Sequence, residues 1–317
     1  MKAFLFPLLN CLLLLFCFSS NIKAQRIVFM PQWTLQSQFA GYYVAQEKGF
    51  YREAGLDVEI IHPSASNTAL NHLREGSCDV TTLQLAQAMV LVDEGLSLKN
   101  ILQTSQRNSL MIVPRRDDIR TLEDLKGKKV GIWNAGFGEL ARILDEKEHL
   151  NIEWIPFINN VNLFVSGAID ATLAMGYNEY FQILACGIEP AHVFLFEDLG
   201  FDIPEDGLYV TSSYYQSHRQ ELKAFVEASV RGWRWTAEHP EEALDIVLKY
   251  ARDNQVVTNR VQQKRMLETI LKLQCRKGEK TASFRLDSAQ VKNTSRLLLQ
   301  YGRIKQEVTC QELSGSL

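Results

Sequence analysis

The residues of this sequence best suited to chemistry are aromatic, amide and carboxylate side chains that follow predicted strands. Aromatic rings stack on planar ligands, while amides and carboxylates fix a ligand by hydrogen bonds. In open α/β sheets, ligands bind beyond the carboxyl ends of the strands. The sequence therefore predicts a binding site, with these candidate ligand-binding residues: Trp33, Gln38, Tyr42, Ser66, Asn67, Gln84, Trp133, Asn134, Gly136 and Glu179.

The first group of candidates follows the first predicted strand. Trp33 stands in a polar loop, which favours contact with a ligand, although a place in the core of the lobe stays open. For Tyr43 a place in that core is favoured over contact with a ligand. The segment 64–68 (SASNT) offers hydroxyl groups and a helix N-terminus to an anion or a carbonyl oxygen, or simply caps the helix. Gln84 follows the third strand in the corresponding place.

The second group follows strands in the second half of the chain. The segment 133–139 (WNAGFGE) leads into a predicted helix, so its backbone N–H groups are expected to face a ligand. Glu179, in the segment YNEY, can accept hydrogen bonds from a ring nitrogen or an amine. The alternative for Glu179 is an ordinary acidic residue in a first helical turn.

No pattern in the sequence indicates catalysis. The chain has no GxSxG, P-loop, HExxH or GxGxxG motif, and its six histidines are scattered. With a net charge of −3, it also lacks the basic surplus typical of nucleic-acid binding. We therefore predict no enzymatic activity, no cofactor, no metal site and no nucleic-acid partner.

The N-terminus resembles an export signal. Lys2 precedes an apolar run from Leu5 to Phe18, and Ala24 provides a small residue at a cleavage point. The run is shorter than the roughly 20 residues that span a membrane. We expect a signal peptide over 1–24 and a periplasmic protein. A lipid anchor at Cys17 and an uncleaved anchor helix stay open.

Cleavage at this point changes the charge and the set of cysteines. It removes two of the 34 basic residues and no acid, so the mature charge is 32 − 37 = −5. It leaves four cysteines without metal-ligand spacing. A disulfide between Cys275 and Cys310 is possible in an oxidising compartment, with unpaired thiols as the alternative.

The elements that must position these residues alternate between strand and helix. Short β-branched runs predict strands at 26–30, 57–61, 80–83, 98–106 and 110–114, and then at 128–133, 152–156, 168–175, 193–197 and 208–211. Periodic segments between them predict helices at 39–48, 67–75, 85–94, 121–126, 139–147, 162–166 and 178–185. After Ser212 the pattern is helical, at 216–238, 240–253, 260–272 and 286–300.

This alternation predicts an α/β fold with largely parallel sheets. The pattern restarts near residue 115, so we expect two lobes that face a cleft. Residues 25–114 and 209–317 form lobe 1 with a helical tail, and 115–208 form lobe 2. The crossings between the lobes are expected near 114–120 and 208–212.

Five segments together resemble a known family. They are PQWTLQSQFAGYYVAQEKGFYREAGLDVEI, LREGSCDVTTLQLAQAMVLVDEGLSLKNI, TLEDLKGKKVGIW, GAIDATLAMGYNEY and EHPEEAL. In this order they are similar to periplasmic substrate-binding proteins of ABC importers, of the nitrate/sulfonate/taurine and thiamine-pyrimidine-precursor type. The resemblance covers about residues 26–250. It implies a type II periplasmic-binding-protein fold, with a hinged cleft between two lobes and a helical C-terminal region.

The resemblance also implies a ligand and partners. The Trp33 loop and the YNEY segment look closest to the thiamine-pyrimidine-precursor branch, in which aromatic rings sandwich the pyrimidine and an acid holds its amino group. Carried over, Trp33, Tyr42 or Trp133 would stack on the ring and Glu179 would bind the amine. The expected partners are a small-molecule ligand and an ABC permease in the inner membrane, with the protein itself a monomer.

Three other readings stay open. The lobes could report ligand binding to a membrane kinase, or hold a sulfonate or nitrate. A pyrimidine synthase is the enzymatic alternative.

Overall fold

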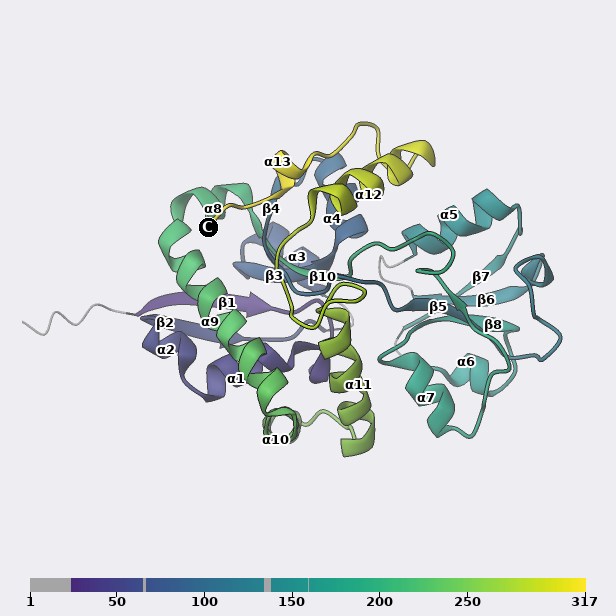
Figure 1. Ribbon diagram of the computed structural model, residues 1–317, viewed down its shortest axis with the longest axis horizontal. Coiled ribbons are helices and arrows are strands. Elements are labelled where there is room, and N and C mark those ends of the chain that lie inside the picture. Colours follow the sequence, from purple (N-terminus) through teal and green to yellow (C-terminus); the bar gives the residue numbers. More distant parts are fainter. Residues whose placement is uncertain (1–23, 65–66, 134–137, 159) are drawn as a thin grey trace, which may run out of the picture.

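The chain forms two lobes, each built around its own five-stranded sheet (Figure 1). This is a computed structural model, and it describes residues 24–64, 67–133, 138–158 and 160–317. The predicted signal peptide lies outside the described residues except for Ala24. The two sheets lie side by side along the long axis of the molecule, and the chain passes between them twice.

The sheet of lobe 1 has the strand order β2-β1-β3-β10-β4. Its strands are β1 (Gln25–Met30), β2 (Leu56–Ile60), β3 (Val80–Gln84), β4 (Leu98–Gln103) and β10 (Asp206–Thr211). β1 is parallel to β2 and β3, whereas β10 is antiparallel to both β3 and β4. The sheet is therefore mixed rather than largely parallel, because the returning strand β10 enters it in the opposite direction.

The sheet of lobe 2 has the strand order β7-β6-β8-β5-β9. Its strands are β5 (Leu110–Pro114), β6 (Lys129–Trp133), β7 (Glu153–Phe157), β8 (Ala171–Met175) and β9 (Phe194–Leu195). β5 pairs antiparallel with β8 and β9, so it belongs to lobe 2 and not to lobe 1 as expected. The crossings consequently lie at 104–109 and 196–205, before the positions expected from the sequence.

The two crossings are hydrogen-bonded to each other. Ser109 donates its backbone N–H and its hydroxyl to Oε1 of Glu205, at 2.5 and 2.9 Å. Arg107 donates to both carboxylate oxygens of Glu197, at 2.9 and 2.7 Å. These contacts tie the two crossings together, so the lobes are joined by one hydrogen-bonded pair of segments rather than by two independent segments.

Helices cover both sheets. The helices that connect the strands are α1 (Ala40–Glu47), α2 (Phe50–Glu53), α3 (Ala69–Glu75), α4 (Leu85–Asp93), α5 (Glu139–Glu148), α6 (Asn162–Val165) and α7 (Glu179–Ala185), with 3₁₀ turns η1 (Ser37–Phe39) and η2 (Glu123–Leu125). The helices after the last strand are α8 (Ser212–Ser217), α9 (Arg219–Glu238), α10 (Pro240–Asp253), α11 (Arg260–Leu273), α12 (Ser288–Gln300) and α13 (Cys310–Leu313). The predicted helix 216–238 is thus divided at His218.

Helix α9 holds α1 against lobe 1 at a glycine contact. A Cβ atom on Gly232 would lie 2.1 Å from the carbonyl oxygen of Gly41, so only glycine permits this approach. Trp233 and Tyr42 pack edge-on beside it, with ring centroids 5.5 Å apart. The contact fixes α1, and with it the loop that leads into α1 from β1.

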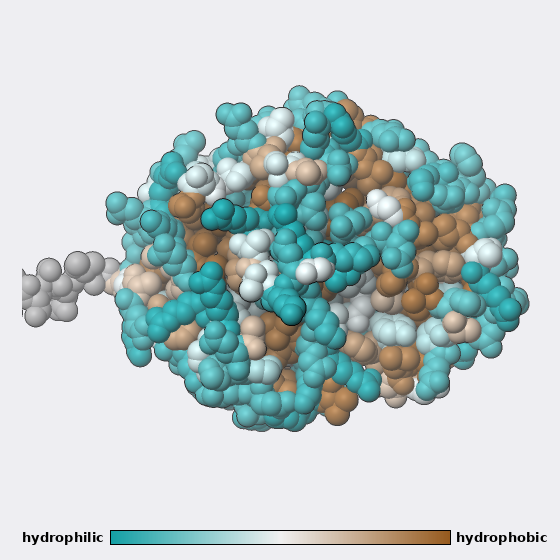
Figure 2. Space-filling view, in the orientation of Figure 1, coloured by the Kyte–Doolittle hydropathy of each residue, from teal (hydrophilic) through white to brown (hydrophobic). Residues whose placement is uncertain are grey.

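The helical C-terminal region packs on lobe 1 and also reaches lobe 2 (Figure 1). Gln262 on α11 donates to the backbone oxygen of Asn178 at 3.2 Å, and Arg303 after α12 donates to Glu146 on α5 at 2.9 Å. Over α9 and α11 the outer face is mainly hydrophilic (Figure 2). The chain ends along the sheet of lobe 1, where Ser314 forms a bridge with Asn100 on β4.

The cysteines of the described chain are unpaired. Cys78, Cys186, Cys275 and Cys310 are all free thiols, so the possible disulfide between Cys275 and Cys310 is absent. In the same part of the chain, no helix has the length and apolar character needed to cross a membrane.

Candidate binding site between the lobes

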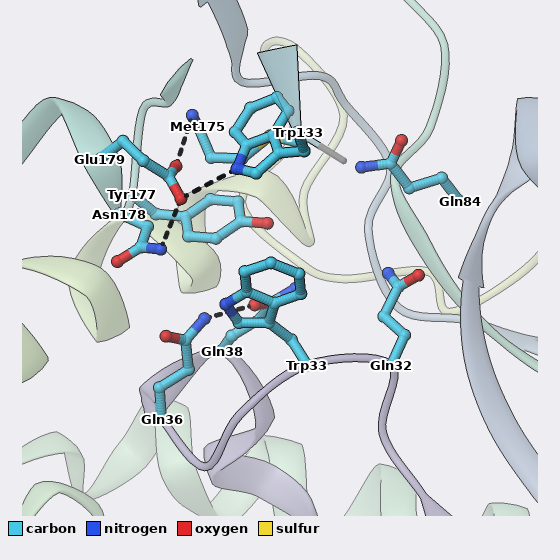
Figure 3. Close-up of a pocket in the computed structure, with 10 residues that line it drawn as sticks. All are labelled: Gln32, Trp33, Gln36, Gln38, Gln84, Trp133, Met175, Tyr177, Asn178 and Glu179. Carbon is cyan, nitrogen blue, oxygen red and sulfur yellow. Dashed lines mark hydrogen bonds between the residues drawn. The ribbon is translucent and has the colours of Figure 1, made fainter. Parts of the chain in front are cut away.

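A pocket of about 330 Å³, measured with its open mouth, lies between the two lobes (Figure 3). Residues from both lobes line it: Gln32, Trp33, Gln36, Gln38, Gln84, Trp133, Met175, Tyr177, Asn178 and Glu179. Most of them follow or end a strand, as expected of a ligand site in an α/β fold.

The Trp33 loop is fixed by hydrogen bonds to its own lobe. The N–H of Gln32 donates to the hydroxyl of Thr82 at 2.9 Å, and the carbonyl of Trp33 lies 2.8 Å from Nδ1 of His62. Burial lowers the pKa of His62, so its ring is neutral, donating from Nδ1 and accepting at Nε2 from the Tyr43 hydroxyl at 2.9 Å. The loop is therefore held in place before any ligand arrives.

Two tryptophans from different lobes lie on opposite sides of the pocket. Trp33 belongs to lobe 1, and Trp133 is the last residue of β6 in lobe 2 (Figure 3). The Trp133 ring rests against Phe157, with centroids 5.5 Å apart. Tyr177 lies beside the space between the two indoles (Figure 3). A planar ring bound there would contact aromatic surface from both lobes.

Glu179 lies at one end of the pocket with 2% of its surface exposed. Its carboxylate accepts hydrogen bonds from the N–H of Met175 at 3.0 Å, from Nδ2 of Asn178 at 2.9 Å and from Nε1 of Trp133 at 3.4 Å. Burial raises the pKa of Glu179, and these donors act in the opposite direction. A ligand donor or cation at this end would stabilise the charged form.

Amide side chains line the lobe 1 side of the pocket. Gln38 and Gln32 donate from Nε2 to the two carboxylate oxygens of Asp206, at 2.5 and 2.6 Å. Gln36 donates from Nε2 to Oε1 of Gln38 at 2.7 Å. Burial raises the pKa of Asp206 to about 6, so Asp206 is ionised at neutral pH. The ionisable groups in and behind the pocket are thus carboxyl groups, accompanied by neutral amides.

The structure brings five of the predicted site residues together. Trp33, Gln38, Gln84, Trp133 and Glu179 line the pocket.

Two other predicted residues, Tyr42 and Asn67, are described by the structure but do not line the pocket. Tyr42 is in the core, because α1 turns it towards Phe29 and Trp233. Asn67 forms a turn with Ser64 ahead of α3, which Thr68 caps. Three of the predicted residues lie outside the described residues: Ser66, Asn134 and Gly136.

Sequence reasoning missed part of the lining and the acid behind it. Gln32 follows the end of β1 by two residues and Met175 ends β8, so the strand-end rule could have found them. Asp206 gave no comparable signal, because PEDG reads as an ordinary turn. Among the described residues, no three His, Cys, Asp or Glu side chains are grouped so that they could hold a metal ion.

Comparisons with known proteins agree with this architecture. The family model described as NMT1/THI5 like matches residues 36–243. A Haemophilus influenzae protein named for thiamine biosynthesis is 26% identical over 73% of this chain and 75% of its own length. The formylaminopyrimidine-binding protein of Halalkalibacterium halodurans is 24% identical, covering 73% of this chain and 72% of its own.

A solved structure shows the same fold at lower identity. The periplasmic aliphatic sulphonate-binding protein SsuA of Escherichia coli superposes with a TM-score of 0.67 at 13% identity, over 92% of each chain. The predicted two-lobed periplasmic-binding-protein fold is thereby confirmed.

Proposed function

Because this chain belongs to the NMT1/THI5-like family, we propose that it is a solute-binding protein that captures a small planar amino-heterocycle between its lobes. One observation carries the proposal. Trp33 and Trp133 come from different lobes to opposite sides of one pocket, with the buried carboxylate of Glu179 at its end. Closure of the lobes on a ring would complete both contacts at once.

The charge of the pocket favours an amine over an anion. A sulfonate or nitrate ion would meet the carboxyl group of Glu179 and would lie near the ionised Asp206, which repels negative charge. An aminopyrimidine brings a planar ring for the tryptophans and N–H donors for the carboxylate. The relative named for binding formylaminopyrimidine supports this class of ligand, of which a thiamine pyrimidine precursor is our preferred member.

The proposed role is delivery rather than reaction. We place the mature chain in the periplasm, where it would pass its ligand to the permease of an ABC importer in the inner membrane. The paired crossings are its proposed hinge. A ligand recovered chemically unchanged from the protein would support this role, whereas turnover of the bound ring would point to a synthase. A kinase gene beside this gene, in place of permease and ATPase genes, would favour sensing.

The ligand class can be tested by thermal denaturation and calorimetry. A panel of aminopyrimidines, riboflavin, an aliphatic sulfonate and nitrate is added to the purified chain. We expect an aminopyrimidine to stabilise it, by about 2.7 kcal/mol at a hundredfold excess over Kd. Stabilisation by the sulfonate or nitrate alone, or by none of the panel, would contradict the proposal.

The variant Glu179→Gln provides the matched comparison. It keeps the size of the side chain and removes the charge, so we expect affinity for the amine to fall at least about tenfold. Unchanged affinity would show that the Glu179 carboxylate does not bind the amine of the ligand.

A further inference from the structure

Asp206 lies behind the pocket and accepts hydrogen bonds from two of the amide side chains that line it. Only 8% of its surface is exposed, and it is the first residue of β10, directly after the second crossing. Its Oδ1 accepts from Nε2 of Gln32 at 2.6 Å, and its Oδ2 accepts from Nε2 of Gln38 at 2.5 Å. Each carboxylate oxygen therefore accepts a hydrogen bond from one amide side chain on the lobe 1 side of the pocket.

The ionised carboxylate of Asp206 determines which way the nitrogen and oxygen of each of these amides point. A carboxylate only accepts hydrogen bonds, whereas an amide donates from its nitrogen and accepts at its oxygen. The nitrogens of Gln32 and Gln38 must therefore face Asp206. The oxygen of Gln38 is then free to accept from Gln36, which it does at 2.7 Å. Gln36 thus also uses its side-chain nitrogen as a donor, and its side-chain oxygen remains as an acceptor for a ligand.

The arrangement leaves Gln32 with an unsatisfied acceptor. Its Oε1 is buried and receives no hydrogen bond from any residue that the structure describes. A buried acceptor without a donor costs free energy, and the bond to Asp206 prevents the amide from turning over to avoid this cost. Gln32 and Gln84 lie at one end of the pocket, and Glu179 lies across it (Figure 3). A second donor group on the ligand would satisfy this acceptor.

We propose that Asp206 is a positioning residue that sets the hydrogen-bond polarity of the lobe 1 side of the pocket. By fixing the amide nitrogens of Gln32 and Gln38 towards itself, it leaves the oxygens of Gln32 and Gln36 as the acceptors of these three amides. The ligand must then bring donors to both ends, one for Glu179 and one for the amide oxygens. The statement about the ligand rests on the proposed function, whereas the orientation of the amides does not.

Binding can be tested with two probes that differ at one position. Both 2,4-diaminopyrimidine and 4-amino-2-methoxypyrimidine have a 4-amino group for Glu179. They differ at position 2, where the amino group of the diamino probe donates hydrogen bonds and the methoxy group of the other probe only accepts them. We expect the wild type to prefer the diamino probe. Asp206→Asn, which can donate and accept, should reduce this preference at least about tenfold.

Glu205→Gln is the matched control. It also replaces a buried carboxyl group by an amide, but Glu205 accepts hydrogen bonds from Ser109 in the crossing and does not line the pocket. We expect it to keep the preference of the wild type for the diamino probe. An equal preference in Asp206→Asn and wild type would overturn the proposed role of Asp206 in selecting the ligand.

The orientation of the amides can be tested without a ligand, by ¹⁵N NMR of the glutamine side chains. In Asp206→Asn we expect the NH₂ signals of Gln36 to shift, although Gln36 reaches Asp206 only through Gln38. Glu205→Gln should leave them in place. Unmoved Gln36 signals would overturn the proposal. If the wild type binds neither probe but these signals shift, the aminopyrimidine assignment fails and the positioning role stands.

Discussion

At the scale of single residues, the pocket depends on aromatic side chains that different parts of the chain supply. Trp33 is half-buried and packs partly against the core of lobe 1, while Trp133 is buried in lobe 2. Neither ring alone encloses a ligand. The free energy of binding should therefore be sensitive to the loss of either one.

Replacing Trp33 by alanine tests this dependence. If Trp33 stacks on the ligand, the variant should lose at least tenfold in affinity, or about 1.4 kcal/mol, measured by calorimetry. Tyr42→Phe is the control, because the Tyr42 hydroxyl lies in the core, 3.5 Å from the hydroxyl of Thr104. Trp33→Ala with wild-type affinity would place Trp33 at the rim instead.

The strand-end rule accounts for what could be predicted at this scale. It identified Trp33, Gln84 and Trp133 as lining residues because each follows or ends a strand. It was wrong for Tyr42, because helical spacing does not show which side of α1 the neighbouring α9 will cover. Asp206 could not be predicted, since its role depends on amides more than 160 positions away in the sequence.

At the scale of elements, the C-terminal helices link the lobes. Contacts to lobe 2 arise from α11, through Gln262 and Asn178, and from the segment after α12, through Arg303 and Glu146. Arg265 on α11 also lies over the Phe181 ring, 5.6 Å from its centroid. Most of this region follows the segment matched by the family model, which ends at residue 243.

The double variant Gln262→Ala, Arg303→Ala should favour separation of the lobes. Each hydrogen bond contributes about 1 kcal/mol or less, since the Arg303 pair is partly exposed, so affinity should fall by up to about thirtyfold. X-ray scattering of the ligand-free variant should show a larger radius of gyration. Lys223→Ala, which breaks an exposed pair within α9, is the control. An unchanged radius and affinity would mean that these contacts do not hold the lobes together.

Most elements could be predicted from local patterns, but their pairing could not. Buried runs such as LMIVP identify a strand without saying which sheet it joins. The assignment of Leu110–Pro114 to lobe 1 was wrong because its partner β8 lies some 60 residues later in the chain. The antiparallel entry of β10 is equally non-local, since it follows from the path of the second crossing.

At the scale of the whole molecule, two adjacent buried acids make stability depend on pH. Burial raises the pKa of Glu205 to about 8 and that of Asp206 to about 6. The folded chain therefore binds protons that the unfolded chain has released. The contribution of these groups to stability is fully present below their ordinary pKa values near 4, and is lost as the pH rises towards 8.

Urea denaturation at several pH values tests this coupling. Each unit of raised pKa corresponds to about 1.4 kcal/mol, so we expect the wild type to lose several kcal/mol of unfolding free energy between pH 5 and pH 8. Glu205→Gln cannot ionise and should make this dependence shallower. If its pH dependence matched that of the wild type, Glu205 would not be the group responsible.

The bridge between Ser314 and Asn100 has a consequence for self-association. β4 is an edge strand of its sheet, and an uncovered edge offers free N–H and C=O groups to another polypeptide. Gly315 occupies one of these groups by donating to the carbonyl of Asn100 at 2.7 Å. At the opposite edge, β2 carries the exposed acids Asp57 and Glu59, which oppose pairing between like copies. Ser314 and Gly315 thus cover part of the β4 edge, and we expect this cover to oppose aggregation through the sheets.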